Sequence, residues 1–411
     1  MTAKRTVVAA FFLLFALIPN TIAQKSAQNG TPVNCGVIVL DGDPTGTTDS
    51  APAFKAALED LTRCGGGTLE VGHGQYKLET TVAKNFLNLA SKITIRGQGS
   101  NSQVVFATGP TVDGLVLQNL EDLTIDGVTF VGSPNLLPDG SPNSSAGSDV
   151  FRAISLDGIL RAKVSNNMFY GIAAPVPGAA IIKATNSYLT VEHNQFLGSA
   201  ACQSGNAYGG VIMADSHIGL RVVHNSFIDY GVLNGVYYSK TPLVWSTAWV
   251  ILMNPNSNSP TDSRTNNLIE ISYNQFDEGA MHAIVINPDQ GPAVTQQVRL
   301  AYNTVNVGLV GGYYLRRIKY LDINGGWAGF RPLGGGSSEV DAITLRSVEF
   351  PTIRNFETDS TKSATRLSVD AGTKMLRIVD SEFSTIVNQA KAWRIEDGAT
   401  VRSGPPKKFL P

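Results

Sequence analysis

The chain has 411 residues and a formal net charge of −1, from 32 basic and 33 acidic residues. This near balance excludes a protein that holds nucleic acid through a general excess of positive charge. Its 41 glycines are typical of a fold with many tight turns. The chain is longer than one ordinary hydrophobic core accommodates, but its length suits a repeat protein.

The first 23 residues have the features of a secretory signal peptide. Lys4 and Arg5 precede an apolar run from Val7 to Ile18, and small residues up to Ala23 provide a site where a signal peptidase would cut. The run is too short to span a bilayer comfortably, which favours a cleaved signal over an anchor. We expect residues 1–23 to be removed, which leaves 30 basic against 33 acidic residues and a charge of −3. The mature protein is then secreted or periplasmic, with no stable membrane insertion.

A capping unit is predicted from about residue 36 to residue 80. The segment GDPTGTTDSAPAFKAALEDL from 42 indicates a turn followed by a short helix, which Asp49 or Ser50 can cap and whose first turn accepts Pro52. The apolar residues of this helix fall on one face, namely Phe54, Ala57, Leu58 and Leu61. The strand repeats that follow in the chain predict a solenoid, a stack of β coils. Because the open end of such a stack needs a cap, we expect the helix to cover the first coil.

The same segment, followed by CGGGTLEVGHGQYKL from 64, resembles the opening of the pectate-lyase-like β-helix family, which also includes rhamnogalacturonase and epimerase-like proteins. The resemblance covers about residues 36–130 by motif and the rest by repeat style. It departs at Ser50, where a second Asp is usual, and at Gly72-His73-Gly74, where Pro-Pro-Gly usually precedes the Tyr. The resemblance implies a right-handed parallel β-helix, a fold that hosts lyases, hydrolases, epimerases and inert stalks alike.

Eight later segments repeat one strand pattern. Their first and third positions are apolar, as Leu189 and Val191 are in one copy, and their last position is Phe in all but one. Such alternation, recurring at intervals of 27 to 49 residues, is typical of stacked β units that cannot bury a face alone. The segments are LTIDGVTF from 123, AKVSNNMF from 162, LTVEHNQF from 189, LRVVHNSF from 220, IEISYNQF from 269, VRLAYNTV from 298, ITLRSVEF from 343 and LRIVDSEF from 376.

A second set of apolar runs lies between these copies, including DGLVLQNL from 113, AAIIKATNS from 179, GGVIMADSH from 209, WVILMNPN from 249 and HAIVINPD from 282. Two or more strands per coil, with no room for crossover helices, predict an all-β fold, a right-handed parallel β-helix with a short N-terminal capping helix. The predicted single domain spans residues 24–400, with coils over about 90–390 and a C-terminal tail at 401–411.

Two positions of the repeat have a predicted structural role. The sixth is Asn in five successive copies, and an inward ladder of amides that supports the coil is favoured over a polar ligand track. These residues are Asn167, Asn194, Asn225, Asn274 and Asn303. His193 and His224 precede two of them, where other copies carry Tyr273 and Tyr302, so we expect a stack of rings there.

Three cysteines are present. Cys35 and Cys64 flank the N-terminal segment, and export permits a disulfide between them. Cys202 then remains a buried or free thiol.

The longest interval between copies, 49 residues, separates LRVVHNSF from IEISYNQF and indicates loops that leave the regular coil. Aromatic side chains in such a loop suit carbohydrate, because sugar rings stack on them. The alternative is that Trp245 and Trp249 only pack the loop onto the coil. The candidate substrate-binding residues are Tyr230, Tyr237, Trp245 and Trp249.

The candidate catalytic residues belong to two chemistries. Uronate β-elimination needs a base and a cation, for which Lys240, Tyr238, His282 and Arg264 are the right types. Hydrolysis needs two carboxylates, for which Asp229 and Glu278 are candidates. No spacing matches a zinc site, and no cofactor is expected, although calcium held by scattered Asp residues stays open.

The sequence favours a secreted carbohydrate-active protein that acts on an extracellular acidic polysaccharide, with a polysaccharide lyase ahead of a glycoside hydrolase of pectin or rhamnogalacturonan type. A non-catalytic carbohydrate-binding or scaffold β-helix is the rival class, since fold analogy alone does not specify a reaction. The oligomeric state stays open.

Overall fold

The chain divides into two units, Met1–Val33 and Asn34–Pro411, and the described residues all belong to the second. The predicted signal peptide, Cys35, Cys202 and most of the predicted tail lie outside them. A computed structural model of the chain describes residues 36–87, 92–132, 150–174, 178–197, 200–201, 210–215, 219–228, 232–233, 236–237, 249–254, 268–279, 282–286, 294–307, 311–330, 340–358, 365–390, 392–395 and 400–401.

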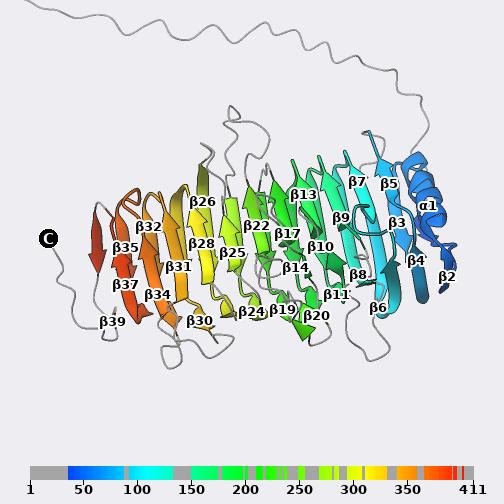
Figure 1. Cartoon of the computed structure of the whole chain (residues 1–411). Helices are drawn as coiled ribbons and strands as arrows, with labels where there is room; N and C mark the ends of the chain where they lie inside the picture. The colour runs from blue at the N-terminus through cyan, green and yellow to red at the C-terminus, as the bar shows by residue number, and fades with distance from the viewer. Residues whose placement is uncertain are drawn as a thin grey trace, which may run out of the picture. The chain divides into compact units, whose positions relative to one another are not determined.

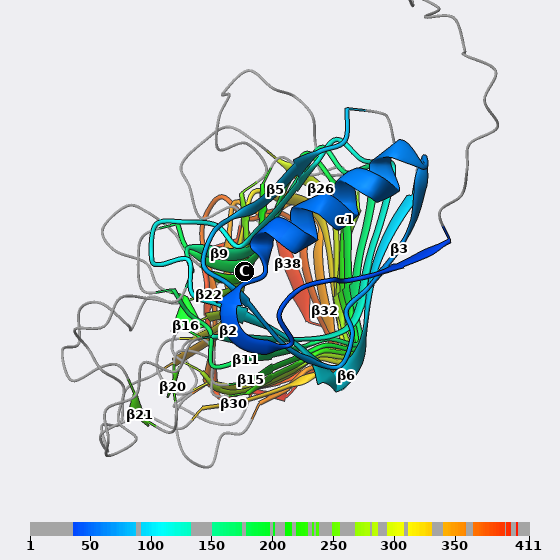
Figure 2. The ribbon, with the colours of Figure 1, turned by 90° about the vertical axis from the view of Figure 1, so that its right-hand side faces the viewer.

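Parallel strands stack coil upon coil in the second unit (Figure 1). Successive coils place strands in an 11-stranded sheet, here called sheet B, and in a 22-stranded sheet, sheet A. Sheet A bends into two arms, so that the coil has three faces when viewed along its axis (Figure 2). This arrangement confirms the predicted right-handed parallel β-helix, since parallel crossovers of this kind are right-handed.

Each face is a run of short strands. Sheet B consists of β5 (Val82–Asn85), β7 (Leu115–Gln118), β9 (Arg152–Asp157), β13 (Ala180–Thr185), β17 (Gly210–Asp215), β22 (Trp249–Asn254), β25 (His282–Ile286), β28 (Gly311–Arg316), β31 (Val340–Arg346), β34 (Thr365–Val369) and β37 (Thr385–Asn388). The first arm of sheet A consists of β1 (Val37–Val39), β3 (Gly66–Glu70), β10 (Arg161–Ser165), β14 (Tyr188–Glu192), β18 (Gly219–Val223), β23 (Leu268–Ser272), β26 (Thr295–Ala301), β29 (Ile318–Asn324), β32 (Pro351–Arg354), β35 (Leu376–Val379) and β38 (Trp393–Ile395).

The second arm consists of β2 (Thr45–Asp49), β4 (Gly74–Leu78), β11 (Met168–Tyr170), β15 (Gln195–Leu197), β19 (Ser226–Ile228), β24 (Gln275–Gly279), β27 (Thr304–Val307), β30 (Trp327–Phe330) and β33 (Glu357–Thr358). Two long strands, β6 (Lys92–Phe106) and β8 (Asp122–Gly132), run through both arms. Three small pairs complete the described strands, namely β12 (Ala173–Ala174) with β16 (Ala200–Ala201), β20 (Val232–Leu233) with β21 (Val236–Tyr237), and β36 (Glu382–Phe383) with β39 (Thr400–Val401).

The predicted cap is helix α1 (Ala51–Arg63), which packs against β3 and β5 at the start of the stack (Figure 2). The Asp49 carboxylate accepts a hydrogen bond from the backbone N–H of Ala51 at 3.0 Å, whereas Ser50 makes no side-chain cap. The predicted apolar face is buried, at Phe54, Ala57, Leu58 and Leu61. Of the two residues predicted to cap the N-terminus of this helix, Asp49 is therefore the one whose side chain does so.

The glycine-and-threonine turn before α1 is organised by Asp43. Its carboxylate accepts hydrogen bonds from the hydroxyl and backbone N–H groups of Thr45, Thr47 and Thr48. The hydroxyls of Thr45 and Thr47, then the backbone N–H groups, hold the pKa of Asp43 far below its usual value. The turn that carries the family resemblance thus has a structural role.

Phenylalanine rings form a column through the core. Phe196 and Phe227 stack with ring centroids 4.8 Å apart, and Phe227 stacks on Phe276 at the same distance. All three are fully buried. Phe106, Phe130 and Phe169 extend the column toward the cap. The Phe that ends the repeat therefore points inward and stacks on its equivalent in the next coil.

One of the eight predicted copies was assigned to the wrong face. ITLRSVEF from 343 lies in β31 of sheet B, with Ile343 and Leu345 pointing inward. Phe350 therefore does not join the column: its backbone is left-handed, with φ of 52°, and its ring is 45 % exposed. Phe356 is the buried ring of that coil instead, and it stacks on Phe383. The error arises because β31 has the same inward alternation as the true copies.

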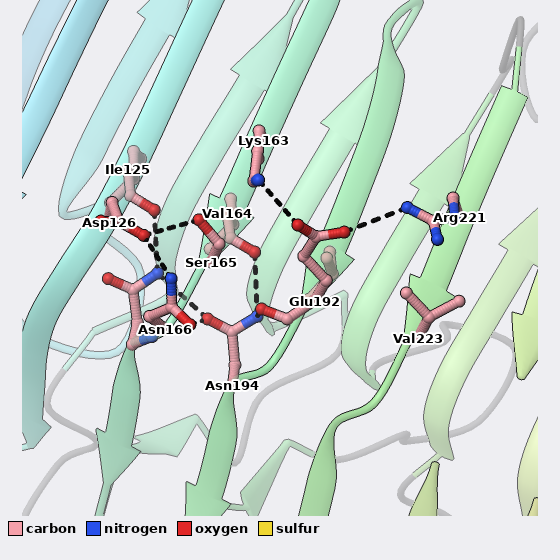
Figure 3. A network of polar contacts seen from close by, with 12 residues as sticks. Ile125, Asp126, Lys163, Val164, Ser165, Asn166, Glu192, Asn194, Arg221 and Val223 are labelled. Atoms are coloured by element: carbon pink, nitrogen blue, oxygen red, sulfur yellow. Dashed lines mark hydrogen bonds and ion pairs between the residues drawn. The ribbon is translucent and has the colours of Figure 1, made fainter. Parts of the chain in front are cut away.

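The five asparagines form the predicted inward ladder at the bend of sheet A. The side-chain oxygen of Asn194 accepts from the backbone N–H of Asn167 at 2.9 Å, and its amide donates to the oxygen of Val164 in the preceding coil (Figure 3). The same pattern continues through Asn225, Asn274 and Asn303. The ladder thus satisfies buried turn backbone and joins successive coils.

Outside the ladder, the preceding residues form the expected stack of rings. His193, His224, Tyr273 and Tyr302 all have left-handed backbone and stack at centroid distances of 5.0 to 5.1 Å. Each ring packs on the ring of the next coil, so the stack joins successive coils on the surface of the bend.

Cys64 is disulfide-bonded, as predicted, and both other cysteines lie outside the described residues. Within the described ranges, no helix has the length and hydropathy needed to cross a bilayer.

Candidate functional site

The outer face of sheet B carries a column of register positions at the start of its strands. The backbone pairings place these residues one coil apart in the order Arg152, Ala180, Gly210, Trp249, His282, Gly311, Asp341 and Arg366. Parallel pairing therefore gathers a histidine, an aspartate and two arginines from segments far apart in the sequence.

His282 has an unusual environment in this column. Its Nδ1 is buried and makes no hydrogen bond with any residue that the structure describes, although the residue as a whole is partly exposed. Its ring meets the ring of Tyr314 edge to face, with centroids 5.9 Å apart. An unpaired polar atom in such a place costs about 1–3 kcal/mol unless a ligand or water satisfies it.

The surroundings of His282 set its protonation state. Burial lowers the pKa of the imidazole to about 4, and the negative charge of Asp341 only partly opposes this shift. Val285 and Met213, on the outer side of neighbouring strands, are buried in a small apolar cluster against which Tyr314 packs. The apolar surroundings keep His282 neutral at pH 7, so the imidazole can accept a proton.

Gly311 makes room for the imidazole. A β-carbon at this position would lie 3.1 Å from Nε2 of His282 and 2.7 Å from the backbone oxygen of Asp341. Any larger residue would therefore displace either the ring or the next strand.

Asp341 is held by two partners. Its Oδ1 accepts a hydrogen bond from Nε of Arg366, and its Oδ2 accepts one from the hydroxyl of Thr344 at 3.3 Å. This carboxylate is already engaged, so it provides a fixed negative charge beside His282 rather than a second free base.

A second protonatable group lies farther along the same face. Burial raises the pKa of the Asp113 carboxyl, against the opposing charges of Arg152 and Lys183. Arg152 lies 3.7 Å from Asp113, and both Oδ1 of Asp113 and Nε of Arg152 are buried without a hydrogen bond. Four strand spacings separate Arg152 from His282 in the column, or about 19 Å. The two groups therefore cannot act on the same bond.

The structure describes a minority of the predicted site residues. It places Trp249 beside His282 in register, Glu278 in β24 near the connection to β25, and Tyr237 in β21. Of the side chains in the predicted set, only that of His282 is described. The remaining predicted residues lie outside the described ranges, namely Asp229, Tyr230, Tyr238, Lys240, Trp245 and Arg264.

Three residues of this site were not predicted from the sequence, namely Tyr314, Asp341 and Gly311. A signal for them exists, because GGYYLR from 311 and VDAITLR from 340 follow HAIVI from 282 at intervals of 29 and 29 residues. Alignment of these runs would have placed the three residues beside His282. Among the described residues, no group of three or more His, Cys, Asp or Glu side chains could hold a metal ion.

No protein-family model matches the chain, and no curated protein matches it. Among solved structures, the chain is similar to DFA-IIIase from Arthrobacter chlorophenolicus A6, with 12 % identity, 92 % of this chain and 98 % of that chain covered, and a TM-score of 0.47. It is also similar to endo-xylogalacturonan hydrolase from Aspergillus tubingensis, with 9 % identity, coverage of 89 % and 96 %, and a TM-score of 0.43. A PL6 alginate lyase in complex with a trisaccharide has 12 % identity, coverage of 90 % and 94 %, and a TM-score of 0.47. With identities of 12 % or less and TM-scores below 0.5, these similarities do not identify a reaction for this chain.

Proposed function

We propose that the protein is exported, that it acts on an extracellular acidic polysaccharide, and that it cleaves by β-elimination on the outer face of sheet B. The observation that carries this proposal is the neutral imidazole of His282, with a buried nitrogen that has no protein partner. A general base must be unprotonated at the working pH and within reach of the proton that it takes, and the unpaired nitrogen of a neutral imidazole meets the first condition.

The reaction can be written around this base. His282 takes the proton from carbon 5 of a uronate, the electron pair forms the double bond between carbons 4 and 5, and the glycosidic oxygen on carbon 4 leaves. Tyr314, whose ring contacts that of His282 edge to face, is the proposed donor of a proton to the leaving oxygen. A cation must neutralise the uronate carboxylate during this step, and Arg264 remains the proposed source. Lys240, which the sequence favours as the base, becomes a second proposed cation once His282 takes that role.

Two described carboxylates speak against hydrolysis at this place. Asp341 is engaged by Arg366 and Thr344, and Asp113, whose coil precedes that of Arg152, lies about five strand spacings from the His282 position, or about 24 Å. Paired carboxyl groups in glycosidases lie within about 10 Å of each other. Asp229 and Glu278 remain the candidates for the alternative hydrolase. Tyr237, Tyr230, Trp245 and Trp249 would hold flanking sugars in either case, with Tyr238 as a further proton carrier.

A screen of product chemistry tests the proposal. The purified protein is incubated with pectin, alginate, rhamnogalacturonan and a glycosaminoglycan, and the products are followed by ultraviolet absorbance and by reducing ends. Unsaturated products support the lyase. New reducing ends without unsaturation indicate a hydrolase, and retention of the polymer without turnover indicates a binding protein.

A further inference from the structure

A pocket of about 480 Å³ lies on the outer face of the first arm of sheet A, across strands β23 to β35. Buried Val298 and Leu321 form part of its lining. The strand β32 that contributes to it lies on the opposite side of the coil from β9 and β22 of sheet B (Figure 2). The pocket is therefore separate from the His282 site.

One wall of this pocket consists of exposed apolar side chains. The rings of Tyr320 and Phe350 stack with centroids 5.5 Å apart and an interplanar angle of 21°. They are 47 % and 45 % exposed, and Leu268 beside them is 48 % exposed. Phe350 is the aromatic residue that the repeat pattern would place in the core, and its left-handed backbone puts it outside instead. Adjacent exposed rings offer a surface for the apolar faces of sugars.

The pocket also has an excess of positive charge. Three guanidinium groups and one carboxylate line it, those of Arg299, Arg354, Arg377 and Asp322. Asp322 is paired with Arg354 at 2.9 Å. Arg299 forms no ion pair with any described residue, since the neighbouring Glu270 is paired with Arg221. Its guanidinium therefore has donors available for an anion.

Earlier coils of the same arm lack this excess. Lys163 binds one oxygen of Glu192 at 2.7 Å, and Arg221 binds the other at 3.0 Å (Figure 3). Arg221 also reaches Glu270 at 3.4 Å. On these coils Lys163 and Arg221 are each matched by a nearby carboxylate, whereas Arg299 in the pocket forms no ion pair with a described residue.

We propose that this pocket is a second, non-catalytic binding site for a uronate-bearing sugar chain. The guanidinium of Arg299 binds the carboxylate, and the pair Tyr320 and Phe350 carries the sugar rings. An arginine and stacked aromatic rings select an anionic chain with flat apolar faces. The site does not depend on the chemistry at His282, and it would hold polymer to the protein whether or not sheet B cleaves it.

Binding calorimetry tests the site with tetragalacturonate and tetramannuronate as probes. His282→Gln is used as the background, so that a cleaved probe does not obscure binding. Arg299→Gln and Tyr320→Ala should each raise the dissociation constant of the probe at one class of sites by at least about tenfold. Arg161→Gln is the matched control, because Arg161 lies on the same arm but is paired with Glu121 and Asp122.

The proposal is overturned if neither probe binds, if Arg299→Gln binds as tightly as its parent, or if Arg161→Gln weakens binding equally. Equal affinity for cellotetraose would remove the role of charge, and tighter binding of an oligothymidylate would point to nucleic acid. Absence of cleavage by the native protein, with binding at this pocket retained, would contradict only the proposed reaction.

Discussion

The imidazole of His282 lies against Gly311, so that a β-carbon at position 311 would come within 3.1 Å of its Nε2. The same β-carbon would clash with the backbone oxygen of Asp341 at 2.7 Å. The glycine therefore fixes both the ring and the spacing to the next strand.

We expect Gly311→Ala to lower the free energy of unfolding by about 1–3 kcal/mol, since the overpacked strand must shift. Denaturant unfolding of this variant, of His282→Gln and of the double variant measures whether the two positions are coupled. The losses of unfolding free energy in the two single variants should sum to more than the loss in the double variant. Strict additivity would mean that Gly311 does not position the imidazole.

The pKa of His282 predicts a specific dependence of stability on pH. Burial holds its pKa at about 4 in the folded chain, against 6.5 for an ordinary histidine. Between these values the unfolded chain binds a proton here and the folded chain does not, so stability falls as pH is lowered through this window.

We expect about 2 kcal/mol of the unfolding free energy to be lost through this residue between pH 7 and pH 4.5. The same urea titrations on His282→Gln should show a shallower decline with pH. If the two proteins lose stability in parallel, the imidazole is not desolvated in the folded state.

The column of phenylalanine rings predicts a large cost for shortening one of them. Phe227 is fully buried between Phe196 and Phe276, so Phe227→Ala should lower the free energy of unfolding by about 3–5 kcal/mol. Leu160→Ala serves as the control, because Leu160 is 48 % exposed. Similar losses in the two variants would show that the column does not stabilise the coil.

The asparagine ladder predicts a cost of a different kind. The side-chain oxygen of Asn225 accepts from the buried N–H of Asn194 at 2.9 Å, and its amide donates to Val191 in the preceding coil. Asn225→Ala leaves these backbone groups unpaired, and we expect a loss of about 3 kcal/mol. The exposed Asn101, replaced by Ala, should change stability little. An equal melting temperature for both variants would contradict the claim that the ladder stabilises the fold.

The sequence was sufficient for the fold because the repeat has a physical cause. Inward positions must be apolar in every coil, and Leu189 and Val191 obey this rule as Ile269 and Ile271 do. The same rule assigned Phe350 to the core in error, because β31 also alternates. The true sheet A copy of that coil contains Ile353, and after a shorter turn it ends at Phe356. Alternation identifies a strand but not the face it occupies.

The site could be predicted only in part. The break in repeat spacing drew attention to the segment before His282, and His282 itself was among the residues chosen. Tyr314 and Asp341 were missed because they become neighbours of His282 only through the pairing of three strands, and no single strand reveals that pairing. Asp113 was missed because its pKa depends on burial, which no local pattern encodes.

The rate of unsaturated product release by His282→Gln, on whichever acidic polysaccharide the native protein cleaves, tests the central claim most directly. Glutamine is similar in size and uncharged, so the melting temperature at pH 7 should stay nearly unchanged, while kcat should fall by at least about a hundredfold, the usual contribution of a general base. A variant that cleaves at the native rate would contradict the assignment of His282 as the base.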